Sequence, residues 1–193
     1  MLIRESSNAC SIESFFFKEE PYVCGMKTIF VTAIFCALAC LARGQEVSKA
    51  TAQLESKSGS QVTGTVTFTK VGDEVQVVAD IQNLKPGKHG FHIHEKGDCS
   101  APDAASAGAH FNPTQQHHGG PMTAAHHAGD LGNIEADASG KAHLDWKGKL
   151  SLSGTDSIIG KSIVVHEKED DLKTDPSGNS GARIACGAIN AAD

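Results

Sequence analysis

The stretch Gly90-Phe91-His92-Ile93-His94-Glu95 holds two histidines, two residues apart, in an apolar frame. In a β-strand, residues i and i+2 point to the same face. His92 and His94 would therefore present two imidazoles side by side on a rigid backbone. Imidazole is the commonest protein metal ligand and suits copper, zinc, iron and nickel. The stretch thus predicts a strand with a metal-binding face.

Further metal-ligating side chains follow along the chain, in turn-rich or strand-like settings. They are His110, His118, His127, Asp130 and His166. One His-x-His pair is weak evidence for a metal site. Six histidines and an aspartate in such settings are much stronger evidence for one.

Composition limits the class of protein and its partners. The 193 residues are enough for one domain with a real core. A formal net charge of -6 argues against nucleic acid or an anionic membrane surface as the main partner. Aromatic residues make up only 5% of the chain, whereas there are 20 glycines and 10 histidines. This composition favours a compact β protein with many loops.

Outside the histidine stretch, the alternation of β-branched and polar residues predicts short strands separated by turns. The expected strands cover 62–68, 75–81, 141–146, 162–166 and 182–189, with a turn at 71–74. Residues 95–140 are dense in Gly, Pro, Ala, Asp and His, and residues 170–181 are polar, so both are expected as loops. No helix of normal length is visible. The pattern indicates an all-β sandwich or barrel.

The N-terminal part has the features of a secretory signal peptide. Lys27 provides a positive n-region, residues 28–41 form a short, mostly apolar segment, and Ala42 and Gly44 are small residues near a cleavage point. We expect residues 1–25 to be an upstream extension of uncertain status, 26–44 the signal peptide and 45–193 the functional domain. A bacterial lipidation box ending at Cys40 and a buried apolar segment are weaker alternatives.

The cysteines follow the same division. Four lie before or inside the signal segment, and only Cys99 and Cys186 lie in the domain. An even pair in an exported chain predicts one disulfide, and two buried free thiols are the alternative.

Six segments, in this order, closely resemble motifs of the copper/zinc superoxide dismutases. They are Gly90–Glu95, Ser106–Pro113, His118–Pro121, His127–Asn133, Val164–Glu167 and Gly181–Gly187. The resemblance covers nearly all of 47–189. It implies the family's fold, an eight-stranded Greek-key β-barrel with two long active-site loops. Residues 170–183 are shorter than in the family's animal members, which favours an exported, bacterial-like form.

The resemblance also implies the roles of the site residues. The copper ligands would be His92, His94, His110 and His166, and the zinc ligands would be His110, His118, His127 and Asp130. Each chain would thus hold one copper and one zinc ion, bridged by His110. Asp170 matches the aspartate that links one copper histidine to one zinc histidine, here His92 and His118. Cys99 and Cys186 match the family's intrasubunit disulfide.

The implied activity is superoxide dismutation. Copper would alternate between two oxidation states, oxidising one superoxide to oxygen and reducing the next to peroxide. His110 would release copper on reduction and take up a proton, and Arg183 would attract and orient the anion. Lys168 and Lys173 are candidates for a positive funnel around Arg183, because the local field, not the net charge, guides a substrate.

Several interpretations stay open beside this one. A metal carrier or partner-binding module on the same barrel is the main alternative, and a generic exported zinc protein is another. The sequence does not decide between a monomer and a homodimer. The histidines that match no ligand position are interpreted as surface residues: His89, His117, His126 and His143. Glu95 and Glu167 are expected to be solvated or to hold loops.

Overall fold

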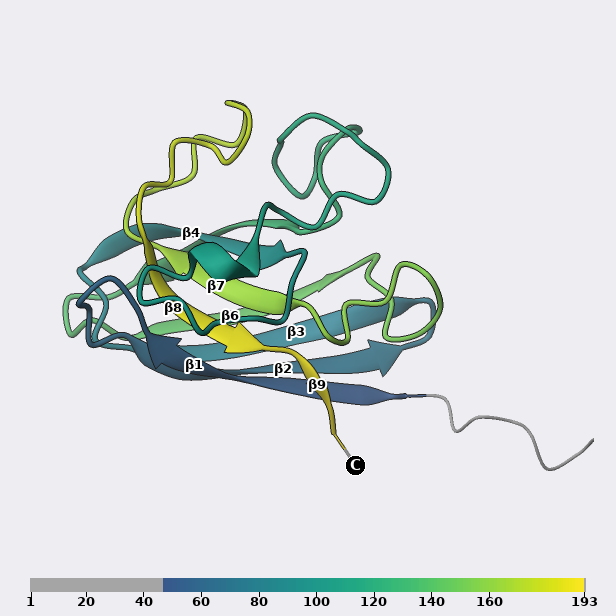
Figure 1. Cartoon of the computed structure of the whole chain (residues 1–193), viewed down its shortest axis with the longest axis horizontal. Coiled ribbons are helices and arrows are strands. Elements are labelled where there is room, and N and C mark those ends of the chain that lie inside the picture. Colours follow the sequence, from purple (N-terminus) through teal and green to yellow (C-terminus); the bar gives the residue numbers. More distant parts are fainter. Residues whose placement is uncertain (1–46, 193) are drawn as a thin grey trace, which may run out of the picture. The chain divides into compact units, whose positions relative to one another are not determined.

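The structure is a computed structural model that describes residues 47–192 (Figure 1). The expected extension and signal peptide, 1–25 and 26–44, lie outside the described residues. The described part contains nine strands and one 3-10 turn, η1 (Ala105–Ala107), and no α-helix. The strands are β1 (Lys49–Ser56), β2 (Thr63–Val71), β3 (Glu74–Gln82), β4 (Gly87–His94), β5 (Asp130–Ala136), β6 (Ala142–Gly148), β7 (Ser162–His166), β8 (Arg183–Ala188) and β9 (Asn190–Ala191).

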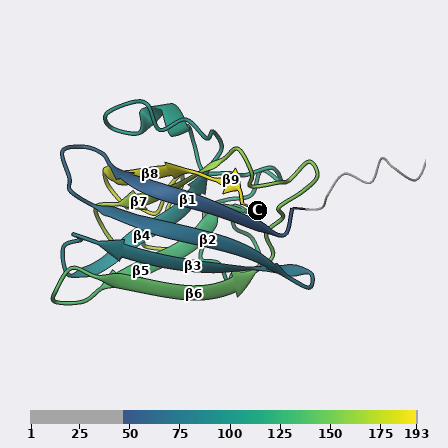
Figure 2. The same ribbon diagram turned by 90° about the horizontal axis from the view of Figure 1, so that it is seen from below.

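The strands form one antiparallel sheet that closes on itself. Its order is β2-β3-β6-β5-β4-β7-β8-β1-β9, and an additional pairing of β1 with β2 completes an eight-stranded barrel. The two-residue β9 extends the edge by pairing with β1 at Thr51↔Asn190. Because β6 lies between β3 and β5, the chain leaves β3, forms β4 and β5, and then returns beside β3, which is a Greek-key connection (Figure 2). The predicted barrel is confirmed.

Alternation along β4 explains how the barrel presents a polar site. Phe91 and Ile93 are fully buried and belong to the barrel core. His92 and His94 point to the opposite face, yet they too are buried, because two long loops cover that face. The loops are residues 95–129 and 167–182, and both extend from the same side of the barrel (Figure 1).

A disulfide between Cys99 and Cys186 joins the first long loop to β8. The two cysteines are 87 residues apart in the chain. In the chain-entropy model, closing a loop of this size stabilises the folded state by up to about 4–5 kcal/mol. The bond thus fixes the base of the loop against the barrel. In residues 47–192, no helix is both long enough and apolar enough to span a membrane.

Two of the eight barrel strands, and the two-residue β9, are missing from the sequence-based expectation. β5 lies within the expected loop 95–140, where Gly132 and Asn133 interrupt the alternation. Its Leu131 and Ile134 nevertheless pack in the core. β1 was not predicted because its buried face is carried mainly by the small residues Ala50 and Ala52. In both strands, pairing with neighbours outweighs a weak local pattern.

Candidate metal centre

Two sets of buried side chains converge on the outer face of the barrel beneath the long loops. The all-histidine set consists of His92, His94, His110 and His166. The mixed set consists of His110, His118, His127 and Asp130. Within each set, the potential ligand atoms lie within 4.8 Å of one another, and His110 belongs to both. The structure therefore brings together all seven expected ligands.

The barrel strands position three members of the all-histidine set. His92 and His94 stand on one face of β4, and β4 pairs with β7, which ends at His166. The β4–β5 and β7–β8 ladders are both irregular here, at Gly90/His92 and at Val165/His166. Such irregularities redirect side chains beside functional sites. Gly90 is required by space, because a Cβ there would lie 3.0 Å from the His92 ring and 2.8 Å from the Ser180 Cβ.

The hydrogen bonds of these rings fix which nitrogen remains available. His94 Nδ1 donates to Gly108 O at 2.9 Å, and His166 Nδ1 donates to Gly181 O at 3.2 Å. A carbonyl oxygen can only accept, so the Nε2 of each ring keeps its lone pair. His92 is turned the other way, since its Nε2 lies 2.8 Å from Asp170 Oδ2.

Buried ring nitrogens without a hydrogen-bond partner mark where a ligand belongs. In the described part of the chain they are His92 Nδ1, His94 Nε2, His110 Nε2 and His166 Nε2, with His118 Nδ1 as a fifth atom that makes no well-aligned hydrogen bond although Asp130 Oδ1 lies 3.1 Å away. Leaving one buried polar group unsatisfied costs about 1–3 kcal/mol, so five such atoms in one place call for an explanation. Four of them belong to the all-histidine set, and all four have a free lone pair. This arrangement fits a metal ion bound entirely by nitrogen.

Asp130 organises the mixed set. Its Oδ1 lies 2.8 Å from His110 Nδ1, 3.1 Å from His118 Nδ1 and 3.2 Å from His127 Nδ1. The nitrogens of His127 and His110 are 3.4 Å apart. Ligands of a tetrahedral ion with bonds of about 2.0–2.1 Å are separated by roughly 3.3 Å, so these spacings suit zinc. The other carboxylate oxygen accepts from the backbone N–H groups of Gly119 and His127, which fixes the aspartate.

Asp170 connects the two sets. Its carboxylate lies 2.8 Å from His92 Nε2 and 2.9 Å from His118 Nε2, so one side chain orients a ring in each set. The backbone N–H of Asp170 donates to Asn133 Oδ1, and Asn133 Nδ2 donates back to the Asp170 carbonyl. Gly178 closes over the carboxylate: its φ is +62°, and a Cβ there would overlap Asp170 Oδ1. A larger residue at 178 would displace this link.

The two sets differ in protonation in the metal-free protein. Burial lowers the pKa of His92 to about 4 and that of His166 to about 3, and it also lowers the pKa of His94. These rings are neutral near pH 7 and can bind a metal directly. Burial acts the same way on His118, but hydrogen bonds and charge from Asp130 and Asp170 outweigh it and raise its pKa to about 10.

The carboxylates respond in the opposite direction. Burial would raise the pKa of Asp130, but its hydrogen bonds with His110 and His118 outweigh this effect and hold the pKa well below its usual range. Asp170 behaves in the same way through His118 and His92. The mixed set therefore carries ionised groups that a cation would neutralise, whereas three rings of the all-histidine set are uncharged.

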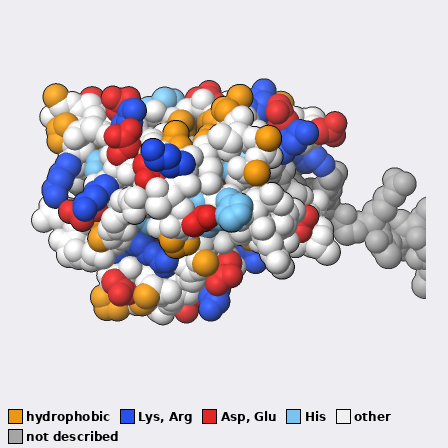
Figure 3. Space-filling view, turned by 90° about the horizontal axis from the view of Figure 1, so that it is seen from above, with side chains coloured by type: hydrophobic (Ala, Val, Ile, Leu, Met, Phe, Trp, Pro, Cys, Tyr) orange, Lys and Arg blue, Asp and Glu red, His pale blue; other side chains and the backbone are white. Residues whose placement is uncertain are grey.

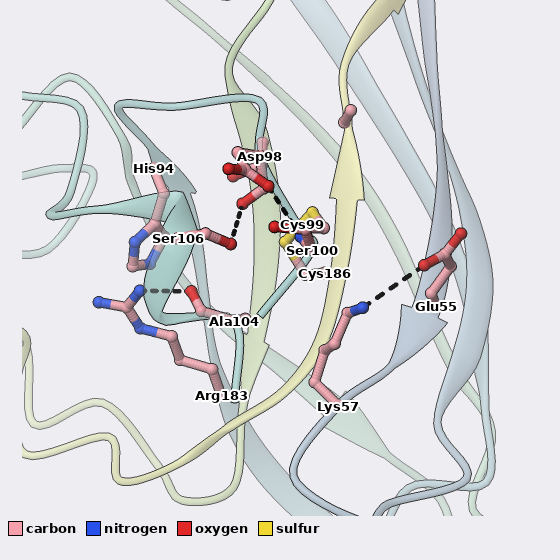
Figure 4. The surroundings of a disulfide bond; sticks show 12 residues. Glu55, Lys57, His94, Asp98, Cys99, Ser100, Ala104, Ser106, Arg183 and Cys186 are labelled. Carbon is pink, nitrogen blue, oxygen red and sulfur yellow. Dashed lines mark hydrogen bonds and ion pairs between the residues drawn. A yellow bond between two sulfur atoms is a disulfide. The ribbon is translucent and has the colours of Figure 1, made fainter. Parts of the chain in front are cut away.

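A pocket of about 650 Å³ opens onto the all-histidine set. His94, His110 and His166 line it together with Arg183. The Arg183 guanidinium lies beside His94 and donates from Nη1 to the carbonyl of Ala104 at 2.8 Å (Figure 4). Ala104 belongs to the loop that the Cys99–Cys186 disulfide holds (Figure 4). A fixed cation thus faces the exposed side of the set.

The comparisons with known proteins agree with this geometry. Residues 62–189 match the family described as copper/zinc superoxide dismutase. The chain belongs to the copper/zinc superoxide dismutase family. It is 42% identical over 179 residues to the extracellular copper/zinc superoxide dismutase of Drosophila melanogaster, a match that covers 85% of this chain and 98% of the relative. The corresponding protein of Caenorhabditis elegans is 41% identical over 170 residues, covering 82% of this chain and 76% of the relative.

A solved structure extends the agreement to three dimensions. The crystal structure of the clock protein EA4 superposes with a TM-score of 0.71 at 41% identity, and the match covers 77% of this chain and 98% of that one. The relatives named here come from a fly and a nematode, so they lend no support to the expected likeness to exported bacterial forms of the superoxide dismutase family.

The interpretation of His89 as a surface residue is wrong. Its side chain is buried, and its two ring nitrogens lie 2.8 Å from the carbonyl oxygens of His166 and Lys85. His89 therefore supports the backbone of His166, a member of the all-histidine set, and belongs to neither set itself. Sequence showed no signal for this role, because both partners are backbone atoms. His117 and His143 are exposed as expected, and His126 is half-buried.

Fewer basic side chains line the pocket than the sequence suggested. Neither Lys168 nor Lys173 lines the pocket, although the aliphatic part of Lys168 packs against Gly181. Glu95 accepts from the Ala109 backbone and Glu167 pairs with Lys85, so both hold loops as expected. Of the residues lining the pocket, Arg183 is the one Lys or Arg side chain.

Proposed function

We propose that this chain is an exported superoxide dismutase with one copper and one zinc ion at the ligands named above. It converts two superoxide anions and two protons to oxygen and hydrogen peroxide. The observation that carries the proposal is the pair of four-ligand sets sharing His110, with unpartnered nitrogens at one end and a carboxylate at the other.

The donor atoms support the assignment of the two metals. Four nitrogens with one open side suit copper, whereas three nitrogens and a carboxylate in a closed tetrahedron suit zinc. Asp130 is buried, so the zinc set has no open position for a substrate. The all-histidine set borders the pocket, so superoxide reaches copper and not zinc. Copper supplies the one-electron chemistry, and zinc, which has no redox chemistry, orders the ligands.

Two residues act on the substrate and its protons. Arg183 is charged across the physiological range and presents a planar donor group, so it attracts and orients the anion in the pocket. His110 lines the same pocket, and its Nε2 is the atom that can carry a proton to the reduced product. Asp170 and the carbonyls of Gly108 and Gly181 hold the remaining rings in one orientation.

Export fits the rest of the chain. The signal peptide proposed at 26–44 would direct the domain 45–193 out of the cell, where a disulfide such as Cys99–Cys186 persists. Relatives with this domain are named extracellular enzymes. N-terminal sequencing of secreted protein tests the processing site. Sedimentation of the metal-loaded chain distinguishes a monomer from a homodimer.

The decisive experiment is superoxide decay, followed by stopped flow with purified, metal-loaded protein. We expect Arg183→Glu to keep both metals, to lose at least about tenfold in catalytic rate, and to show an inverted or flat dependence on salt. Arg183→Lys, which keeps the charge, serves as the matched control. A metal carrier would bind both ions without consuming superoxide, and a generic zinc protein would hold one metal per chain.

A further inference from the structure

The pocket above the all-histidine set contains one carboxylate, Asp103. It lines the pocket together with Arg183, and no other Asp or Glu side chain does so. Its side chain is exposed. The charged groups at this entrance, other than histidines, are therefore one cation and one anion. An entrance of this kind is unexpected for a site that must attract an anion.

Asp103 and Arg183 are fixed to the same short turn. Asp103 Oδ1 accepts from the backbone N–H of Ala105 at 3.0 Å, and Arg183 Nη1 donates to the carbonyl of Ala104 at 2.8 Å. Ala104 is fully buried and has a left-handed backbone, with φ 56°. The same turn therefore anchors both charged side chains, each by one hydrogen bond to its backbone.

The two charges act on each other without a direct ion pair. No Arg183–carboxylate contact occurs within the described residues. Burial lowers the pKa of Arg183, and the charge of Asp103 is the influence that opposes it. An anion entering the pocket is thus attracted by Arg183 and repelled by Asp103, since both line it.

The charged side chains around the pocket do not form a strong positive region that would dominate over Asp103 and Arg183. On the face that carries the long loops, acidic and basic side chains are interspersed, and no continuous basic patch is visible (Figure 3). The whole chain has a net charge of -6. Since charges beyond about 8–10 Å are screened at physiological salt, the groups at the pocket itself decide the local field.

We propose that Asp103 limits the entry of anions into the pocket and so lowers both the rate of the enzyme and its affinity for anionic inhibitors. The inference rests on the proposed function of that pocket. Removing this charge should favour small anions in general, superoxide and anionic inhibitors alike, because the effect acts on charge and not on shape.

The test uses the full, metal-loaded protein with Asp103→Asn, because an amide oxygen still accepts from Ala105 and only the charge is lost. We expect the rate constant for superoxide decay to rise about two- to fivefold at low ionic strength, and the gain to vanish at high salt. Azide, titrated by its absorption band on copper, should bind about two- to fivefold more tightly. Asp103→Glu should behave like the wild type in both measurements.

Asp98→Asn is the matched control. Asp98 lies in the same loop, and its Oδ1 accepts from the backbone two residues on, at Ser100, but it does not line the pocket. We expect little change in this variant. An equal gain in Asp98→Asn would show that only net charge matters, and an unchanged or weaker azide affinity in Asp103→Asn at full metal content would overturn the proposal. If the wild type binds azide but does not consume superoxide, the proposed function fails while the role of Asp103 is still tested.

Discussion

The two halves of the metal centre are built differently. In the all-histidine set, three ligands stand on strands β4 and β7 and are held by the same core that closes the barrel. In the mixed set, His118 and His127 lie in the loop 95–129, and only Asp130 starts a strand. The first half is rigid because of hydrophobic packing. The second half depends on Asp130 and its hydrogen bonds.

This difference explains how one fold builds two candidate metal sites of distinct character. His94 and His166 stand on strands, and burial keeps their rings neutral. One nitrogen of each ring donates to a backbone carbonyl, and both rings border the pocket. Loop-borne rings gathered around a carboxylate form a closed, charged site. An open site suits catalysis and a closed site suits structure, and His110 and Asp170 join them.

The largest expected effect comes from removing the residue that both halves share. His110→Ala should lose both metals and more than about a hundredfold in activity, because each set loses one ligand and the copper pocket loses its proton carrier. Elemental analysis and superoxide decay measure this. His143→Ala, which removes an exposed histidine from β6, should match the wild type. Full occupancy of both metals in His110→Ala would refute the bridging role.

The next effect should separate the two halves. Asp130→Asn keeps the shape of the side chain but removes the charge around which three rings gather. We expect zinc affinity to fall by about a hundredfold or more and copper affinity by less than about tenfold, as measured by chelator competition. Asp137→Asn, an exposed aspartate bound to backbone N–H groups, is the control. Equal losses of zinc and copper affinity would mean that copper binding in the all-histidine set depends on Asp130 as much as zinc binding does.

The sequence predicted the two halves for different reasons. Strand β7 and the site-bearing part of β4 were both predicted from local sequence, and the i, i+2 spacing placed His92 and His94 on one face before any family resemblance was considered. The mixed set could be assigned only through that resemblance. Nothing in the spacing of His118, His127 and Asp130 shows that three nitrogens meet one carboxylate oxygen, since the long loop 95–129 must first fold against the start of β5.

Other features were beyond sequence reasoning because backbone atoms create them. His89 can be buried because its two ring nitrogens hydrogen-bond to the carbonyl oxygens of Lys85 and His166. A sequence does not show where backbone carbonyls point. Arg183 likewise donates to the carbonyl of Ala104, and the left-handed backbone of Ala104 orients that carbonyl. Glycine is the residue that usually marks a left-handed conformation in a sequence, so an alanine there gave no sign of it. Strand β5 was not predicted because Gly132 and Asn133 interrupt its apolar pattern. Local patterns thus gave most strands, and tertiary contacts decided the rest.

A smaller effect should fall on both halves at once. Asp170→Asn can still orient one of its two rings but not both, because an amide offers one acceptor oxygen and His92 and His118 both donate. We expect affinity to fall by about 10–100-fold for each metal. Asp171→Asn is the control, since Asp171 binds only within its own loop, at Lys173, Thr174 and Asn179. Loss of a single metal would show that Asp170 serves one half alone.

The smallest expected effect concerns protons. In metal-free protein, His92 and His166, with pKa values of about 4 and 3, should stay neutral down to about pH 5, while His118, with a pKa raised to about 10, should stay charged up to about pH 9. Imidazole nitrogen NMR distinguishes these states directly. A neutral His118 at pH 7, or a charged His92, would contradict the contrast between the halves.

The same contrast predicts how zinc affinity depends on pH. Below its pKa, His118 carries a proton that zinc must displace, so lowering the pH weakens binding, and His118 alone contributes about tenfold per pH unit. Calorimetry in buffers of different ionisation enthalpy counts the released proton. In Asp170→Asn, one of the carboxylates that raise the pKa of His118 is gone, so fewer protons should be released at pH 8–9. In this variant the proton on His118 is bound more weakly, so it competes less with zinc. The loss of zinc affinity relative to the wild type should therefore become smaller as the pH falls, and this pH dependence separates the electrostatic role of Asp170 from its role in orienting the rings.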